Sequence, residues 1–201
     1  GSETSATARG TGTLTVKPTV AASVGVGAAA TGDLLLTEAL LSTFQDGFRY
    51  VTLGDTAKTT TLTVNTTRTF TDSLALVNSG TSPMVLNSTV DVGGNTLTLT
   101  SGGTVSGSGN ILADKLLLNG SGDYTLATAT GHRINTIAAA TPNTVDFINQ
   151  QSFEVGTASP PSNVAVEGVS TATAVTLEAS GAASNFTVTK GVNTPLMTLV
   201  A

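Results

Sequence analysis

Hydrophobic and polar residues alternate in short segments along most of the chain, and glycine, serine and asparagine separate one segment from the next. The pattern is clearest at residues 94–128, where the segments 96–99, 115–118 and 124–126 alternate between corner residues. A period of two between turn-forming residues is typical of β-strands joined by corners. The pattern therefore predicts an all-β chain that winds into successive parallel coils.

Apolar residues recur about every 20 positions, which suggests how the coils stack. The spacings between successive members of the series are 21, 21, 19, 18, 20 and 21 residues for Leu76, Leu97, Leu118, Ile137, Val155, Val175 and Leu196. A three-sided coil with short corners needs such a spacing, and repeats of this length are typical of solenoids. A β-sandwich of the immunoglobulin type is the alternative fold, because it also has a short strand every 8–12 residues.

One short helix is expected near residues 38–46. Thr37 is a suitable N-cap, Glu38 falls in the first turn, and Gly47 can end the helix. Apolar residues also recur every four positions between Leu36 and Phe48. The alternative is a strand at 34–36 followed by a wide turn.

The remaining chain reads as one continuous body. Residues 1–12 are expected to form a loose N-terminal segment that begins with the cloning scar Gly1-Ser2, and residues 13–201 a single continuous β-helix segment. Pro160-Pro161 is the one plausible internal boundary, and we interpret it as a corner. The chain is expected to be a piece of a longer protein. Its exposed ends predict end-to-end self-association or a capping element at residues 13–24.

Asparagine and threonine provide further support for stacking. Asparagine closes several strands, and its amide can bond the same amide one coil away; these residues are Asn65, Asn78, Asn87 and Asn119. Outward-facing threonines are expected to align across coils, among them Thr61, Thr63, Thr96, Thr98 and Thr100. Both residue types also suit any turn or solvated strand face.

Composition narrows the classes of partner. Only 10% of the residues are charged and the mean hydropathy is +0.24, which favours a folded chain over a disordered one. A net charge of −5 gives no basic surface for nucleic acid or for anionic membranes, and no apolar run is long enough to span a bilayer. We therefore expect no nucleic-acid partner and no membrane insertion. The chain has no cysteine, so neither a disulfide nor a thiolate metal site can form.

Several segments carry a family resemblance. They are 115–126 (KLLLNGSGDYTL), 134–140 (INTIAAA), 153–156 (FEVG), the motif GGNTLTLTSGG and residues 40–54. The chain resembles the passengers of filamentous-haemagglutinin-like exoproteins of two-partner secretion, which are giant bacterial surface adhesins. The resemblance implies a right-handed parallel β-helix, export to the bacterial outer surface, and a role in adhesion or biofilm. No part matches the secretion domain of that family, so an interior stretch of the shaft is expected.

The residues give little sign of a reactive site. The densest group of charges comprises Asp114, Lys115 and Asp123, with His132 and Arg133 one coil further on. We interpret it as a surface ion-pair patch rather than an active site, and His132 as an exposed corner residue. A single histidine without cysteine cannot build a zinc site of the usual type. We therefore predict no catalytic residue, no metal site and no cofactor, and the sequence names no binding residue.

The function expected from the sequence is that of a non-enzymatic rod. The chain is expected to act as a structural or adhesive segment of a secreted bacterial surface protein, which contacts a host surface, a neighbouring cell or matrix through other parts of its parent. The alternatives are a carbohydrate-active β-helix enzyme or tailspike-like binding module, which needs three or more carboxylates on adjacent coils, and an ice-binding solenoid, which needs regular threonine rows.

Overall fold

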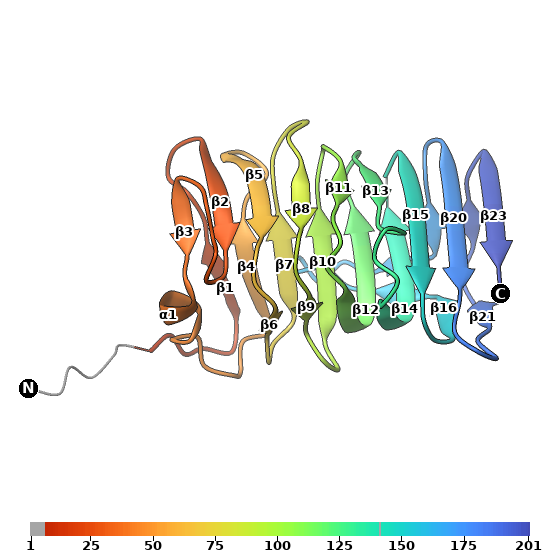
Figure 1. Ribbon diagram of the computed structural model, residues 1–201, viewed down its shortest axis with the longest axis horizontal. Helices are drawn as coiled ribbons and strands as arrows, with labels where there is room; N and C mark the ends of the chain where they lie inside the picture. Colours follow the sequence, from red (N-terminus) through yellow and green to blue (C-terminus); the bar gives the residue numbers. More distant parts are fainter. Residues whose placement is uncertain (1–6, 141) are drawn as a thin grey trace, which may run out of the picture.

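The computed structural model describes residues 7–140 and 142–201, which form an elongated body with the first described strands at one end and the last at the other (Figure 1). The chain passes back and forth between two parallel sheets and adds one strand to a sheet at nearly every pass. Strands that are neighbours in a sheet therefore lie one pass apart in sequence. The expectation of a nearly all-β chain with parallel sheets is confirmed.

Sheet 1 has 12 strands within the described residues. They are β1 (Thr13–Val16), β4 (Tyr50–Gly54), β6 (Arg68–Thr69), β7 (Leu74–Val77), β9 (Val90–Asp91), β10 (Thr96–Thr100), β12 (Ile111–Asn119), β14 (Arg133–Ala140), β16 (Phe153–Val155), β19 (Val169–Ser170), β21 (Phe186–Val188) and β22 (Val192–Asn193). Its main path runs β1-β4-β7-β10-β12-β14-β16-β21.

Over the same described residues, sheet 2 has nine strands, in the order β23-β20-β15-β13-β11-β8-β5-β2-β3. Their bounds are β2 (Ala22–Val26), β3 (Leu34–Leu36), β5 (Thr59–Val64), β8 (Met84–Leu86), β11 (Val105–Ser106), β13 (Asp123–Thr125), β15 (Thr144–Asn149), β20 (Ala174–Ala179) and β23 (Leu196–Val200). Among the strands of the described chain, the one antiparallel pair is β17 (Thr157–Ala158) with β18 (Val166–Glu167). An immunoglobulin-type sandwich consists of antiparallel sheets, so the pairing directions do not fit that alternative.

The register of sheet 1 differs from the predicted series by two residues at the steps from Leu76 to Ile137, whereas the predicted pair of Ile137 and Val155 is confirmed. Leu97 pairs with Leu74 and with Leu116, whereas Leu99 pairs with Leu76 and Leu118. In an alternating strand, residues two positions apart point to the same face, so stepping through the leucines cannot distinguish these two registers. The end of the series is also wrong, because Val175 lies in β20 and Leu196 in β23, which both belong to sheet 2.

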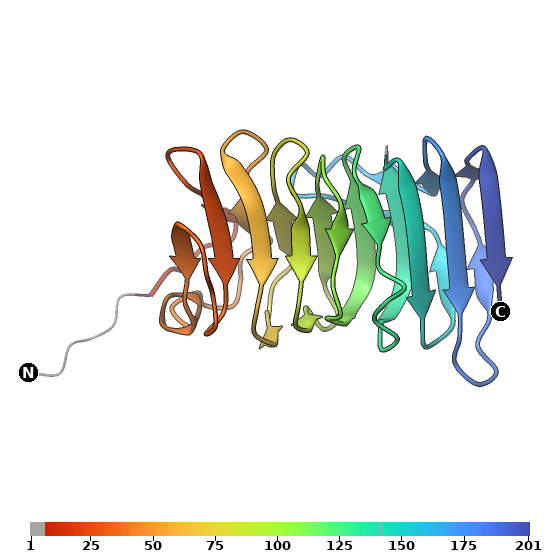
Figure 2. The ribbon, with the colours of Figure 1, turned by 45° about the horizontal axis from the view of Figure 1, so that its top comes forward.

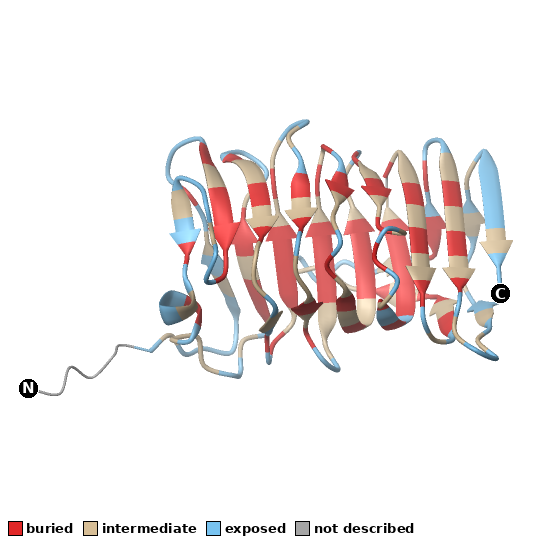
Figure 3. Cartoon of the chain, in the orientation of Figure 1, coloured by how far each residue is buried: buried red, intermediate tan, exposed pale blue. Residues whose placement is uncertain are grey.

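The hydrophobic core lies between the two sheets and continues along most of the body (Figure 3). In sheet 1 the ladder of Leu74, Leu97 and Leu116 is completely buried. In sheet 2 the inward ladder includes Met84 and Tyr124, whose exposed fractions are also 0%. Each layer covers the layer before it, so the inward-pointing residues of the middle strands lose contact with water on every side.

Glycine at two neighbouring corners allows successive passes of the chain to approach closely. A Cβ atom placed on Gly122 lies 1.9 Å from the carbonyl oxygen of Gly103, and one on Gly103 lies 2.2 Å from the carbonyl oxygen of Ser82. Any side chain at these corners therefore forces two backbones apart. Gly107 and Gly109 lie at corners of the same kind, since a Cβ atom on them lies 2.1 Å from the carbonyl oxygen of Leu86 and 2.2 Å from that of Ser88.

The helix α1 is shorter than predicted, since it covers Glu38–Leu41 rather than residues 38–46. Its start is as expected, because the hydroxyl of Thr37 accepts a hydrogen bond from the amide of Leu40 at 3.4 Å. The amides of Thr43 and Phe44 bond only three residues back, to Leu40 and Leu41, and the amide of Gln45 donates to the carbonyl of Ala8 at 3.0 Å. A contact with a distant segment has replaced the local helical bond.

The N-terminal segment predicted to be loose is described only from residue 7 onward, and residues 1–6 with the expected cloning scar lie outside the described residues. Ala8 forms a parallel bridge with Phe44, and the carbonyl of Gly12 accepts from the amide of Arg49 at 2.9 Å. The residues that close the core at this end are Leu36 of β3 and Leu41 of α1, both 0% exposed. Residues 13–24, where a cap was expected, supply ordinary strands of both sheets.

Candidate functional site: a strap across the outer face of sheet 1

Residues 156–168 leave the winding path and form what we call the strap. It begins after β16, contains the antiparallel pair of β17 and β18, and returns to sheet 1 at β19. In Figure 2 it is the light blue segment that reaches back from the cyan strands toward the yellow and green ones. No other segment of the described chain contains an antiparallel strand pair.

The base of the strap packs on apolar side chains that point outward from sheet 1. Leu117 of β12 and Ala138 of β14 are both 0% exposed, although neither faces the main core. They form a separate small cluster with Ala158 and Val166 of the strap. This second apolar layer holds the strap against the sheet.

The far end of the strap is held by hydrogen bonds to β4 and to the residue before it. The hydroxyl of Tyr50 donates to the carbonyl of Ser159 at 2.6 Å, and the guanidinium of Arg49 donates to the carbonyl of Pro161 at 2.7 Å. Burial raises the pKa of Tyr50, and hydrogen bonds, first that from Thr98, offset only part of this effect. The phenol therefore stays protonated and remains a donor.

The strap turns back just beyond these contacts. Asn163 has a φ of 64° and its amide donates to the carbonyl of Pro160 at 2.8 Å, which closes the turn. Asparagine tolerates this left-handed conformation better than most residues. Val164 beside it is 71% exposed, so the tip of the strap projects into solvent.

A row of outward residues on sheet 1 is buried along the path of the strap. Ala75, Thr98, Leu117 and Ala138 pair in succession across β7, β10, β12 and β14, and none is more than 1% exposed. The corresponding outward row of sheet 2 is half-exposed; it comprises Val85, Ser106, Thr125 and Asp146. This row of sheet 1 is therefore covered, unlike the corresponding row of sheet 2.

A groove of about 470 Å³ opens between the strap tip and the first strands of sheet 1. Its wall on the strap side is Pro160, Pro161 and Ser162, and its floor carries hydroxyl, amide and apolar groups from Thr13, Thr15, Thr52, Val77, Thr100 and Asn119. The charged groups at its edge are Lys17 and Asp55, whose Nζ and Oδ2 atoms lie 3.5 Å apart. The groove contains no aromatic side chain, so it offers no stacking platform for a sugar ring.

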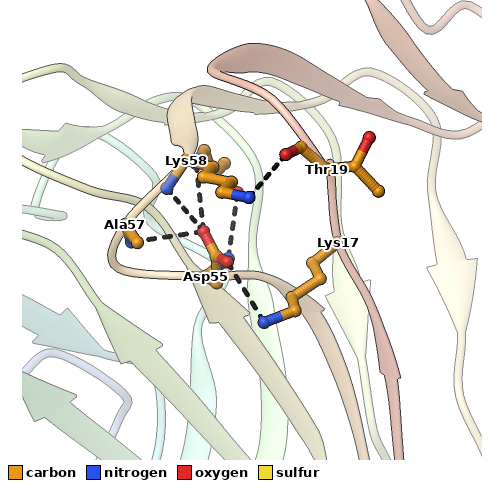
Figure 4. A network of polar contacts seen from close by, with 6 residues as sticks. Lys17, Thr19, Asp55, Ala57 and Lys58 are labelled. Atoms are coloured by element: carbon orange, nitrogen blue, oxygen red, sulfur yellow. Dashed lines mark hydrogen bonds and ion pairs between the residues drawn. The ribbon is translucent and has the colours of Figure 1, made fainter.

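Asp55 organises the loop at the edge of the groove (Figure 4). Its Oδ1 accepts from the amides of Lys58, Ala57 and Thr59 at 2.7, 3.2 and 3.2 Å. Desolvation alone raises the pKa of Asp55, but these three donors, together with Lys17, outweigh it and lower the pKa below its ordinary value. The carboxylate therefore has a structural role as the acceptor for a tight turn.

Comparison of the chain with protein-family models, with curated proteins and with solved structures found no match.

The charged group noted in the sequence does not assemble into an ion-pair patch. Asp114 accepts from the side-chain amide of Asn135 at 2.8 Å, and Asp123 from that of Asn143 at 2.7 Å. Lys115 donates to the carbonyl of Thr157 in the strap at 3.3 Å. The salt bridges of the described residues lie elsewhere, at Lys17–Asp55, Arg68–Glu38 and Lys190–Glu167.

His132 is buried, so its interpretation as an exposed corner residue is wrong. Its exposed fraction is 0%, and its ring stacks on Phe147 with 4.9 Å between centroids. Nδ1 accepts from the amide of Ile111 at 2.8 Å, and Nε2, which must then carry the proton, donates to the carbonyl of Leu126 at 2.8 Å. Burial lowers the pKa of His132, and the bond to Leu126 offsets only part of this. The neutral ring joins two backbone segments.

Only one of the expected asparagine contacts forms between the predicted residues. The amide of Asn87 donates to the side-chain oxygen of Asn65 at 2.8 Å, as stacking predicts. Asn78 instead donates to the carbonyl of Ser82, and Asn119 accepts from the amide of Gly120. Asparagine thus closes corners more often than it forms a ladder.

The predicted threonine rows are interrupted. Thr98 pairs with Ala75 and Leu117, and Thr63 pairs with Gly25 and Val85. Regular rows, which an ice-binding surface needs, are absent at these positions. In the part of the chain that the structure describes, no three His, Cys, Asp or Glu residues are grouped so that they could hold a metal ion, and no helix is long and apolar enough to cross a membrane.

The strap is the feature that the sequence interpretation missed. The prediction of a simple corner at Pro160-Pro161 overlooks two apolar runs that indicate a longer excursion. Strands β12 and β14 contain the continuous apolar runs 116–118 and 137–140 where alternation was expected. A strand that is apolar on both sides is usually buried on both faces. These runs were the available evidence that something covers sheet 1 from outside.

Proposed function

We propose that the chain is a segment of a right-handed parallel β-helix and that it acts as a rigid, non-enzymatic rod. The observation that carries the proposal is the pair of parallel ladders that run the length of the body around one continuous core. Each pass of the chain hydrogen-bonds to the next through its backbone, so stiffness does not depend on particular side chains. Strand spacing of ~4.8 Å per pass gives the rod its length.

The strap supports a mechanical role. It extends from β16 to Arg49, whose guanidinium bonds the carbonyl of Pro161, a residue 112 positions away in sequence. Between them it crosses β14, β12, β10 and β7, a span of about 24 Å at the usual strand spacing. A solenoid is held together mainly by contacts between neighbours. The strap adds a contact between distant passes and thereby resists bending and fraying.

We further propose that the rod belongs to a secreted protein of the bacterial outer surface and serves adhesion or biofilm attachment. This part rests on the resemblance to filamentous-haemagglutinin-like passengers in segments such as 115–126. In this proposal the rod holds a binding region of its parent away from the cell. The contact with a host surface, a neighbouring cell or matrix is made by other parts of the parent. End-to-end association of rods is a second mode of contact.

An enzymatic role has less support. Asp114 bonds the side-chain amide of Asn135 in β14, and Asp123 bonds that of Asn143 directly before β15, which is a structural use of a carboxylate. His132, the one histidine, has both ring nitrogens engaged by backbone groups. We therefore propose no catalytic residue and no cofactor.

Two measurements test the rod. Small-angle scattering of the purified chain should give the distance distribution of an elongated particle, and circular dichroism should show dominant β-structure. A spherical particle or a helical spectrum rejects the rod. The adhesive role is tested by replacing residues 13–201 in the parent protein with a flexible Gly/Ser linker of the same length. Attachment under flow should fall while soluble ligand still binds, and unchanged attachment contradicts the role.

A further inference from the structure

The strap is an insertion into one pass of an otherwise regular winding. From β4 to β16, partner residues on successive strands of sheet 1 lie 18–23 positions apart in sequence. The next pair, Val155 of β16 and Val188 of β21, lies 33 positions apart. Without residues 157–168 this separation is 21, which falls within the range of the other passes.

Both ends of the strap lie at the same position of β14. Ile137 pairs with Val155, which precedes the strap. Ala139 pairs with Val169, which follows the strap. Only Ala138 lies between these two pairs on β14, so β16 and β19 are two parts of one strand position that the strap interrupts.

Two glycines at the neck of the strap share the hydrogen bonds that a single residue makes in a parallel ladder, where its amide donates to the neighbouring strand and its carbonyl accepts from it. The amide of Gly156 donates to the carbonyl of Ile137 at 3.0 Å, and the carbonyl of Gly168 accepts from the amide of Ala139 at 2.9 Å. The amide of Gly168 also donates to the carbonyl of Gly156 at 2.7 Å, which closes the neck. The strap can therefore leave the sheet without any change in the bonds of β14.

Between its ends the strap is joined to the rod by few contacts. Strands β17 and β18 form a two-stranded sheet of their own, and among the described residues no backbone-to-backbone hydrogen bond joins residues 157–167 to either large sheet. The apolar cluster under the strap is separate from the main core. The remaining contacts are hydrogen bonds from Tyr50, Arg49 and Lys115 to carbonyls of the strap, and the exposed ion pair of Glu167 with Lys190. Segments with few buried contacts open at a lower free energy than the body of a protein.

We propose that the strap is a latch, which opens as one unit at its glycine neck and uncovers part of the outer face of sheet 1 while the passes of the rod stay folded. Glycine suits such a hinge because it adopts backbone angles that other residues avoid, and Gly168 has a φ of 73°. Closed, the strap braces distant passes and covers Leu117 and Ala138. Open, it exposes these two side chains to solvent and to other molecules. The latch requires the stacked passes of the rod but not its adhesive role.

Thiol labelling measures the opening directly, because the chain has no cysteine of its own. Ala138→Cys places a thiol under the strap, and the matched control Ala139→Cys places one on the next residue of the same strand, inside the main core. The two alanines are 0 and 1% exposed, so each thiol reacts only when its cover opens. Under native conditions the thiol at position 138 should react with dithiobis(nitrobenzoate) at least ~100-fold faster than the thiol at 139, because local opening costs less free energy than global unfolding. Equal rates overturn the latch, since strap and rod would then open together.

Tyr50→Phe, introduced into each cysteine variant, tests whether the strap is the cover that opens. It removes the hydrogen bond to the carbonyl of Ser159 and should speed labelling at position 138 severalfold, while the rate at 139 stays unchanged. An unchanged rate at 138, or an equal increase at both positions, overturns the latch.

Deletion of residues 157–168, which joins Gly156 to Val169, tests the insertion. The shortened chain should keep its β-rich circular dichroism spectrum, because one glycine can make both neck bonds. Its thiol at position 138 should react as fast as an exposed thiol, while the thiol at 139 stays protected. Loss of the folded spectrum would show that the strap is part of the rod and overturns the proposal. A spherical particle in scattering of the intact chain overturns the rod function, whereas the ratio of the two labelling rates tests the latch alone.

Discussion

Replacing His132 with phenylalanine separates the two roles that the buried ring combines. Phenylalanine keeps an aromatic ring next to Phe147, so the stacked contact at 4.9 Å can persist. It has no ring nitrogen, so the amide of Ile111 loses its acceptor, while the carbonyl of Leu126 keeps only the 3.4 Å bond from the amide of Ala129. Both groups lie at a site where the side chain that served them is 0% exposed, so water cannot easily replace it.

The magnitude follows from one orphaned backbone amide, that of Ile111. A buried donor left without a partner costs about 1–3 kcal/mol, so His132→Phe should lower the free energy of unfolding by at least about that amount. In a chain of this size each kcal/mol corresponds to about 2–4 °C in Tm, so a decrease of at least ~2 °C is expected. Arg133→Gln, at the exposed neighbouring position, is the control and should change stability by less than about 0.5 kcal/mol.

The pH dependence distinguishes the hydrogen-bond argument from a simple packing defect. Burial lowers the pKa of His132 below 6.5 in the folded chain, so the unfolded chain binds this proton first as the pH falls. The contribution of the neutral His132 to the free energy of unfolding is therefore complete above pH 6.5, and it is lost as the pH falls from 6.5 toward the pKa of His132 in the folded chain. Thermal unfolding from pH 8 to 5 should show this loss in wild type and not in His132→Phe. Equal slopes in both proteins, or a Tm within 1 °C of wild type at pH 8, would refute the reasoning.

Three further predictions follow from the corners, the strap and the Asp55 turn. Gly122→Ala should lower the free energy of unfolding in urea by about 1–3 kcal/mol. The control Gly94→Ala, where a Cβ meets nothing within 4 Å, should be nearly neutral. Equal effects would contradict the close approach of the backbones at Gly122 and Gly103. Tyr50→Phe removes the hydrogen bond to Ser159 and should speed proteolysis of the strap tip severalfold, while hydrogen exchange of the backbone amides in the sheets stays unchanged. An unaltered cleavage rate would show that the bond does not hold the strap. Asp55→Asn should make stability fall less steeply below about pH 4. The pKa of Asp55 is lower in the folded chain than in the unfolded one, so its carboxylate contributes stability above the unfolded pKa, and this contribution is lost as the pH falls through the folded pKa. An unchanged acid profile would count against this reasoning.

The sequence was sufficient for the parallel strands and the spacing near 20, because period-two alternation and corner residues are local properties. It could not fix the register, since Leu97 and Leu99 point to the same side and either one satisfies the pattern. It also overestimated α1, whose last turn is replaced by the bond from Gln45 to the distant Ala8. Local propensity carries no information about such partners.

The environment of His132 and the path of the strap depended on contacts between distant residues. A histidine that follows glycine is typical of a corner in the chain. The backbone groups that His132 joins, however, are those of Ile111 and Leu126, which lie 21 and 6 residues before it in sequence. The strap was in principle detectable from Leu117 and Ala138, which make their strands apolar on both faces. What no local pattern reveals is that Pro161 ends its excursion beside Arg49.

The strap also has a consequence for the order in which the chain matures. Residues 49 and 117 are synthesised well before residues 158–166, and a chain emerging from its N-terminus can form the first strands as soon as they appear. Until the strap follows, Leu117 and Ala138 lie uncovered on an already assembled sheet. The nascent chain therefore passes through a stage in which apolar side chains are exposed on the outer face of sheet 1. Completion of the strap covers these side chains and joins the early residue Arg49 to the late residue Pro161.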